Sequence, residues 1–258
     1  SALPARSEMC IRDSDDDTPF DDDQMEQLDD QLAAIFQQHS SSRRKEREAL
    51  QRDTALFHNK ILDLLEIYAK EQSANVLAVR LVAPLFALAR GSGDVSPQVA
   101  TRASHILRSR LCRAKEVPHG ALDVAQIVDE LGATHAFVRA TQDPPMADLA
   151  NAVSLYYTKV LLRNGHTDEP AAVYGETLRD FLRRKASPVR PAFLLEGVRR
   201  FPELGWALRA ALLDGARLSY AVHAFRQMQA LTMLQAVLQQ QQHADSRQAS
   251  VSDALAFV

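Results

Sequence analysis

The residues best able to do chemistry stand close together near the start of the chain, where acids fill most of residues 13–23. Asp13 and the aspartates two and four residues later match the first three ligand positions of a calcium loop. That loop needs glycine at its sixth position and glutamate at its twelfth, but these positions hold Thr18 and Gln24. The run repels itself and is expected to be disordered, so it predicts no metal site.

Other residue types that support catalysis are scattered along the chain. The eight histidines form no HxxxH pair, and His105 and His135 lie inside helical patterns where packed or half-exposed histidines are common. Cys112 stands among arginines that could lower its thiol pKa, although we favour a small helix residue near a basic face. The sequence therefore predicts no catalytic residue, no cofactor and no small-molecule substrate, and we expect the chain not to be an enzyme.

The acidic lead also carries two candidate phosphorylation sites. Ser14 precedes three aspartates, as an acid-directed kinase requires, and Thr18 precedes a proline. A phosphate would add about −1.5 to −2 charges at either position. Residues 1–14 also look like the translated end of a sequencing-library transposon, which would make them a processing scar. The alternative is a native disordered tail.

Basic clusters are the main binding signal. The chain has 30 basic and 33 acidic residues; residues 1–30 hold 2 and 11 of these, which leaves 28 and 22, or +6, for residues 31–258. Basic surfaces can neutralise phosphates through counterion release. The alternative for each cluster is a solvated face balanced by nearby acids. The candidate nucleic-acid-binding residues are Arg43, Arg44, Lys45, Arg108, Arg110, Arg113, Lys115, Arg183, Arg184 and Lys185. The acidic lead would compete for these surfaces as a tethered phosphate mimic.

The pattern along the chain predicts an all-α fold. Apolar residues recur at helical spacing in ten segments separated by short Gly, Pro, Ser or Asp breaks, and no segment alternates like a strand. About 44 residues per helix pair falls in the range of HEAT and armadillo repeats, so we expect an antiparallel α-solenoid. A compact irregular bundle is the alternative. We expect helices near residues 24–38, 43–72, 74–90, 97–111, 121–141, 143–163, 169–182, 193–201, 203–213 and 217–242.

The second and third of these helices have further expected features. The second is expected to bury one stripe, made of Leu50, Phe57, Ile61, Leu64, Leu65 and Tyr68. The third is expected to bend near Pro84, because its ring removes a backbone donor.

The organisation of the chain follows from these patterns. We expect a disordered acidic lead over residues 1–23, a helical-repeat domain over 24–242, and the truncated start of a further segment over 243–258. The chain is therefore interpreted as a fragment of a longer protein. With two cysteines and no apolar stretch approaching 18 residues, it predicts a reducing compartment and no membrane partner.

Five segments, in order, resemble the DNA polymerase V / Myb-binding protein 1A (DNA polymerase phi) family, in its C-terminal helical region. They are Asp21–Phe36, Phe57–Tyr68, Ala103–Pro118, Tyr174–Phe181 and Arg200–Trp206. The resemblance implies a HEAT-like protein of the nucleus and nucleolus that supports ribosomal RNA synthesis and ribosome assembly. In animals the family is also linked to transcription-factor binding and corepression. No Asp-Thr-Asp motif on a strand is present for nucleotidyl transfer.

The leading hypothesis is a non-catalytic scaffold whose basic helix faces bind ribosomal DNA, pre-ribosomal RNA, or ribosome assembly and transcription factors. The alternative is a protein–protein platform that acts as a transcriptional coregulator without touching nucleic acid. An enzyme whose active groups lie outside this stretch stays open as a third reading.

Overall fold

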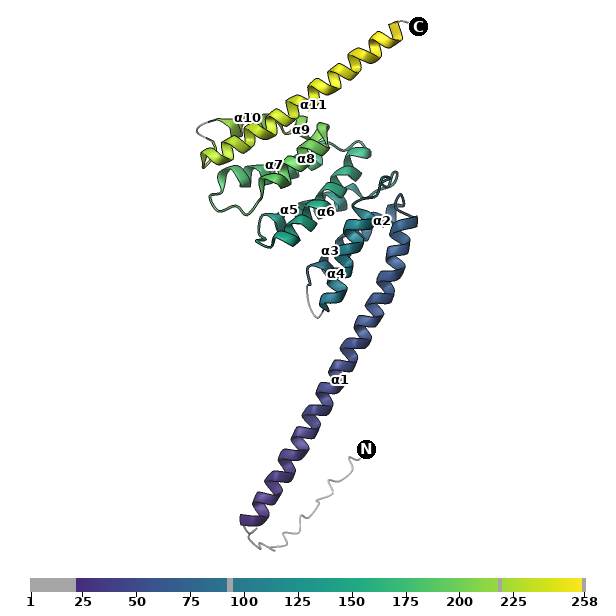
Figure 1. The fold of residues 1–258 in the computed structure, drawn as a ribbon, viewed down its shortest axis with the longest axis vertical. Helices are drawn as coiled ribbons and strands as arrows, with labels where there is room; N and C mark the ends of the chain where they lie inside the picture. The colour runs from purple at the N-terminus through teal and green to yellow at the C-terminus, as the bar shows by residue number, and fades with distance from the viewer. Residues whose placement is uncertain (1–21, 92–94, 218–219, 257–258) are drawn as a thin grey trace, which may run out of the picture. The chain divides into compact units, whose positions relative to one another are not determined.

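The computed structural model describes residues 22–91, 95–217 and 220–256, with side chains at 32, 33, 36 and 38–242 outside those gaps. These residues form helices and no strand, which confirms the all-α prediction (Figure 1). The elements are α1 (Asp22–Glu71), α2 (Val76–Arg80), α3 (Val82–Ala89), α4 (Pro97–Ile106), the π-helical turn η1 (Leu107–Leu111), α5 (Val124–Val138), α6 (Pro144–Arg163), α7 (Asp168–Arg183), α8 (Pro191–Arg200), α9 (Pro202–Ala207), α10 (Arg209–Ala216) and α11 (Ala224–Ala256).

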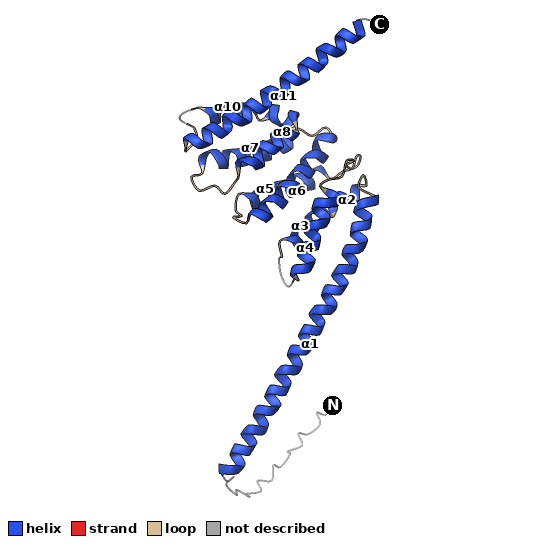
Figure 2. Ribbon diagram, in the orientation of Figure 1, coloured by secondary structure: helices blue, strands red, loops and turns tan. Residues whose placement is uncertain are grey.

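The chain divides into two units, residues 1–54 and residues 55–258. The described part of the first unit is the beginning of α1, where Glu48 pairs with Arg44 at 3.0 Å and with Arg52 at 3.7 Å. The second unit holds the rest of the chain. Its helices follow one another as stacked antiparallel pairs joined by short loops, as Figure 2 shows, and this arrangement confirms the expected α-solenoid.

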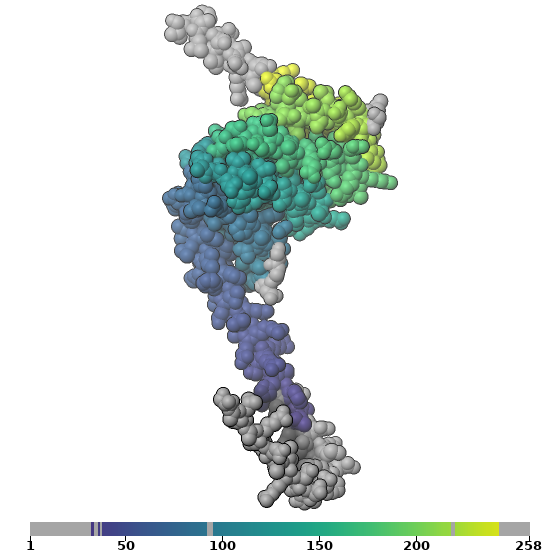
Figure 3. Space-filling view, turned by 180° about the vertical axis from the view of Figure 1, so that it is seen from behind, coloured from purple at the N-terminus to yellow at the C-terminus, as the bar shows by residue number. Residues whose placement is uncertain are grey.

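One hydrophobic core runs through the second unit, from Leu62 to Val237. Side chains fill the space between the stacked helices, whose colours follow chain order from blue through green to yellow (Figure 3). The apolar residues that recur at helical spacing in α4–η1, α6 and α7 are buried. They are Val99, Ala103, Ile106, Leu107, Leu111, Leu149, Val153, Tyr156, Val160, Leu161, Tyr174, Leu178, Phe181 and Leu182.

Local signals set where these helices begin and end. Ser96 Oγ accepts a hydrogen bond from the Val99 amide at 3.4 Å, and Asp123 Oδ1 accepts one from the Gln126 amide at 3.1 Å. Helices α4, α6, α8 and α9 each place proline in the first turn, where its missing amide costs nothing. Gly165 has a φ of +85° after α6, the conformation in which glycine commonly ends a helix.

Helix α1 is continuous where the sequence predicts two helices. Residues Asp22–Glu71 contain neither glycine nor proline, and the serines at 40–42 lie within the helix. The Ser41 hydroxyl donates to the Gln38 carbonyl at 2.9 Å. A serine costs a helix only about 0.5 kcal/mol relative to alanine, too little to end it.

The predicted buried stripe of α1 is wrong for four of its six residues. Leu50, Phe57 and Leu64 are 64–70 % exposed, and Ile61 is 38 % exposed. Leu62 and Ala69 are buried instead, with Leu65 and Tyr68 half-buried. The periodicity marks an apolar side of the helix, but the second unit packs against the adjacent side.

The break expected near Pro84 is confirmed: the helix is interrupted at Leu81, between α2 and α3, because a proline cannot accommodate the carbonyl four residues earlier. Two other boundaries differ from prediction. The helix expected over 203–213 is interrupted at Leu208 and forms α9 and α10. Helix α11 begins at Ala224 rather than at Arg217. Its buried residues are Ala230, Met233, Ala236 and Val237, while Val222, Phe225 and Leu238 are exposed.

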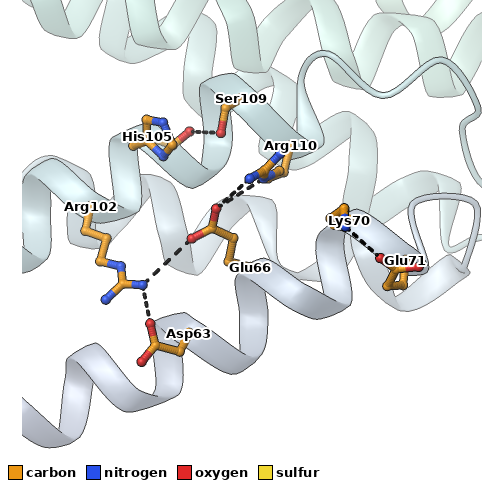
Figure 4. A network of polar contacts seen from close by, with 8 residues as sticks. All are labelled: Asp63, Glu66, Lys70, Glu71, Arg102, His105, Ser109 and Arg110. Carbon is orange, nitrogen blue, oxygen red and sulfur yellow. Dashed lines mark hydrogen bonds and ion pairs between the residues drawn. The ribbon is translucent and has the colours of Figure 1, made fainter.

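Ion pairs attach the end of α1 to α4 and η1. Glu66 accepts from Arg110 Nε at 3.2 Å and Nη2 at 3.0 Å, and Arg102 Nη2 lies 3.8 Å from its other oxygen (Figure 4). Arg102 also pairs with Asp63. Two arginines and two carboxylates therefore form one network across the helices.

Reversing the charge of Glu66 is expected to loosen this attachment. Glu66→Lys would place a third cation beside Arg102 and Arg110, so residues 55–71 should exchange amide hydrogens at least tenfold faster, which corresponds to about 1.4 kcal/mol. The control is Glu71→Lys, because Glu71 pairs only with the exposed Lys70 among the described residues, at 3.2 Å. Equal exchange in the two variants would contradict a structural role for the network.

Candidate nucleic-acid interface

Basic side chains of the second unit meet along a series of hollows formed by η1, α6, α8 and α9. One hollow of about 400 Å³ lies between η1, α6 and α8, and a second of about 490 Å³ lies between α6, α8 and α9. Arg200 lines both, and together with Arg199 it lines a third hollow of about 420 Å³ on α8. We call these three adjoining hollows the basic groove and define its cations as Arg108, Arg113, Lys159, Arg163, Arg199 and Arg200.

The π-helical turn sets the direction of the arginines at one end of the groove. The Cys112 amide donates to the Leu107 carbonyl at 2.9 Å, five residues back, so this turn is wider than an α-helical one. Leu107 and Leu111 are buried. Arg108 faces the groove and donates to the Pro145 carbonyl at 2.8 Å, whereas Arg110 turns away to Glu66.

Lys159 holds the middle of the groove. Its ammonium donates to the carbonyls of Ala114 and Lys115, each at 2.7 Å, which fixes the chain after η1 against α6. Partial burial lowers the pKa of Lys159, and the nearby charges of Arg200 and Arg163 lower it further. Lys159, Arg163 and Arg200 line the same hollow, so cations from α6 and α8 lie close enough to repel one another.

Carboxylates offset only part of this charge. Asp148, Glu196 and Glu203 line the same hollows. Asp148 already pairs with Arg190, and Glu196 accepts from the Asn151 amide. Within the described part of the chain, the side chains of Arg113, Arg163, Arg199 and Arg200 make no ion pair or hydrogen bond. These four cations are available to an anionic ligand.

The structure places the candidate nucleic-acid-binding residues at different sites. Arg108 and Arg113 lie in the basic groove, and the exposed Lys115 follows directly. Arg110 lies elsewhere, in the ion-pair network that joins η1 to Glu66 of α1. The other candidates lie elsewhere: Arg43, Arg44 and Lys45 are exposed on α1 in the first unit, Arg183, Arg184 and Lys185 are exposed at the end of α7, and Ser14 and Thr18 lie outside the described residues.

Two of these remote arginines have partners of their own. Arg183 stacks over the Tyr220 ring at 5.5 Å, and Arg184 pairs with Asp180 at 3.2 Å. Sequence reasoning missed Lys159 and Arg163. The sequence pattern that could have indicated them is a pair of cations four residues apart on an otherwise largely apolar helix.

A second group of side chains has the residue types of a catalytic site, but it is buried. His135 Nε2 lies 2.8 Å from Ser154 Oγ, and its Nδ1 lies 2.8 Å from Thr177 Oγ1. All three residues are inaccessible to solvent, at 0 % exposure. A hydroxyl beside an imidazole can be a nucleophile and its base, but here no substrate reaches either group. The network is part of the core.

Cys112 is not an activated thiol. Burial raises its pKa to about 12, and this effect outweighs the opposing charges of Arg200 and Arg108. The sequence-based possibility of a lowered pKa is therefore wrong. Among the described residues no three potential ligands gather as a metal site would require, and no helix there is both long and apolar enough to cross a membrane.

The fold defines a class of protein, the helical-repeat proteins. A family model described as "Myb-binding protein 1A-like, TPR repeats" matches residues 72–256, and one described as "DNA polymerase phi" matches residues 4–69. The chain belongs to the Myb-binding protein 1A-like family. This confirms the resemblance, and the description of the larger match refers to repeats rather than to a reaction.

Two relatives are similar over most of the chain. Myb-binding protein 1A of Homo sapiens is 30 % identical over 182 residues, which cover 64 % of this chain and 13 % of the relative. A Myb-binding protein 1A-like protein of Danio rerio is 26 % identical over 219 residues, or 74 % of this chain and 17 % of the relative. The chain thus spans less than a fifth of either relative's length. No solved structure matches.

Proposed function

We propose that this chain is part of a non-catalytic nuclear scaffold that supports ribosomal RNA transcription and ribosome biogenesis in the nucleolus. In this proposal the basic groove binds ribosomal DNA or pre-ribosomal RNA, and other faces bind assembly or transcription factors. The observation that carries it is that six cations, from η1 and the turn after it, from α6 and from α8, line three adjoining hollows. The relatives' names add a protein partner, Myb, for those proteins.

The groove suits a phosphate backbone for a physical reason. Each cation that neutralises a phosphate releases a condensed counterion, so affinity comes from many contacts and falls steeply with salt. Arg113 follows η1, Arg163 lies on α6 and Arg199 lies on α8. All three are exposed, so they can pair with phosphates without giving up a partner among the described residues.

Reversing these three charges tests the proposal. The triple variant Arg113→Glu, Arg163→Glu, Arg199→Glu should bind a labelled RNA at least tenfold more weakly at low salt, by fluorescence anisotropy. Its plot of log affinity against log salt should be shallower by about two, because three phosphate contacts are lost. Because all three residues are exposed, the substitutions should leave the core intact. Circular dichroism checks that the variant is folded.

The matched control makes the same change in net charge elsewhere. The variant Arg183→Glu, Arg184→Glu, Lys185→Glu alters the exposed end of α7 and should leave affinity within about twofold. Equal losses in both variants would mean that only net charge matters. Binding that does not depend on salt would count against the groove.

The second candidate function is a coregulator platform that binds proteins alone. It is favoured by the apolar side chains that α1 exposes in the second unit. These are Leu56, Phe57, Ile61, Leu64 and Ile67, at 38–68 % exposure. Exposed apolar patches of this kind mark protein interfaces. If this function holds, Phe57→Asp with Leu64→Asp abolishes partner capture while the groove variant has no effect.

A further inference from the structure

The chain's single tryptophan lies beside the basic groove. Trp206 is on α9, which begins at Pro202 directly after the groove arginines Arg199 and Arg200. Pro202 and Glu203 line the second hollow. Trp206 comes one helical turn after Pro202 and therefore lies on the same face of α9, about 6 Å further along the axis. Its side chain is 44 % exposed.

The helix that carries this ring is firmly positioned. Leu204 and Gly205 are buried on the opposite side of α9. A Cβ at Gly205 would lie 3.1 Å from Val237 and 3.3 Å from Val198, so α9 packs closely on α8 and α11. Trp206 is thus presented outward from a fixed element.

A neighbouring arginine orients the indole. Arg209 Cζ lies 4.6 Å from the centre of the Trp206 ring, and its Nη1 donates to the Trp206 carbonyl at 2.7 Å. The hydrogen bond keeps the guanidinium over the ring. Proteins that bind single strands stack bases on aromatic side chains, with arginines adding cation–π contacts; because Arg209 covers one face of the indole, a base would stack on the other.

On this basis, and resting on the proposed function, we propose that the basic groove takes single-stranded nucleic acid. Its phosphates lie along Arg163, Arg199 and Arg200, and one base stacks on Trp206. A base inside a duplex is covered on both faces by its neighbours, so only a single strand can offer one to the indole. An acidic peptide would satisfy the cations but would leave the ring unused.

Intrinsic fluorescence tests this directly, because Trp206 is the only tryptophan. The full chain is titrated with an unlabelled 12-nucleotide single-stranded RNA, the same sequence as DNA, and the RNA duplex. Both single strands should quench the emission, and the duplex and a poly-glutamate peptide should not. Stronger quenching by the RNA than by the DNA identifies RNA as the preferred strand.

Variants measure what the stacked base contributes. Trp206→Leu should weaken single-strand binding about tenfold, by anisotropy of labelled strands, and leave duplex affinity unchanged. Trp206→Phe should retain part of the affinity because it keeps an aromatic face. The control is Phe225→Leu, which removes another exposed aromatic ring, on α11, and should have no effect.

The outcomes separate this inference from the function on which it rests. If the single strand binds with steep salt dependence but emission and the Trp206→Leu affinity are unchanged, base stacking is overturned and the nucleic-acid scaffold stands. Equal quenching by duplex or poly-glutamate also overturns it. If neither single strand nor duplex binds in the anisotropy assay, both proposals fail.

Discussion

Gly197→Ala is expected to lower the free energy of unfolding by about 2–3 kcal/mol, because the added methyl group has no room. A Cβ at this position would lie 2.6 Å from Cε1 of Tyr174 and 3.1 Å from both Cζ and the hydroxyl oxygen. Tyr174 cannot move aside easily. Its ring is fully buried and stacks on Phe193 at 6.0 Å, and its hydroxyl lies 2.9 Å from Ser154 Oγ.

Chemical denaturation of matched variants measures this effect. Gly132→Ala is the control, because a Cβ at this position in the middle of α5 would meet no described atom within 4 Å apart from its own neighbouring helix backbone. It should stabilise the protein by up to about 1 kcal/mol, since alanine restricts the unfolded chain and favours the helix. A Gly197→Ala variant as stable as Gly132→Ala would show that α8 can shift away from Tyr174 and would contradict the prediction.

The sequence predicts the middle of the solenoid well because each helix there buries its apolar stripe. Helices α6 and α7 contact neighbours on that side, so periodicity and burial agree. Helix α1 shows why the same reasoning can fail. Periodicity marks Phe57 and Leu64 as an apolar side, but it cannot say whether anything covers that side. A helix boundary such as Leu81 also depends on a proline three residues further along.

The candidate interface could be predicted only in part. Linear clusters identify Arg108 and Arg113, but a groove depends on which helices become neighbours. Lys159 and Arg200 are 41 residues apart in the chain and join the same surface because α6 and α8 lie together. The fold also excludes a candidate nucleic-acid-binding residue, because it brings Arg110 into an ion pair with Glu66 of α1. Charge patterns alone contain neither result.

The buried polar network was outside the reach of sequence patterns altogether. His135 on α5 contacts Ser154 on α6 and Thr177 on α7, and its ring lies 4.5 Å from that of Tyr174. A single histidine in a helical pattern gives no sign of such partners. A neutral imidazole donates from one nitrogen and accepts at the other, and the rotatable hydroxyls of Ser154 and Thr177 can complement either tautomer.

This network makes stability depend on pH. Burial lowers the pKa of His135 from 6.5 to about 3, and the charge of Arg139 contributes to the shift. Below pH 6.5 the unfolded chain therefore binds a proton that the folded chain refuses, so stability falls as the pH falls. The loss from this group should be about 1.4 kcal/mol per pH unit, or about 2.7 kcal/mol at pH 4.5, and should level off near the folded pKa.

The variant His135→Gln isolates this contribution from the carboxylates that titrate in the same range. At pH 7 it should be less stable than the wild type by about 2–3 kcal/mol, because the imidazole ring no longer packs in the core and a buried hydroxyl loses its hydrogen-bond partner. Since glutamine does not titrate, the gap in unfolding free energy should close as the pH falls to 4.5. The exposed His105→Gln serves as the control and should follow the wild type throughout. A gap that stays constant from pH 7 to pH 4.5 would mean that His135 takes up its proton in the folded state as readily as in the unfolded one, which an imidazole enclosed by Ser154, Thr177 and Phe193 should not do.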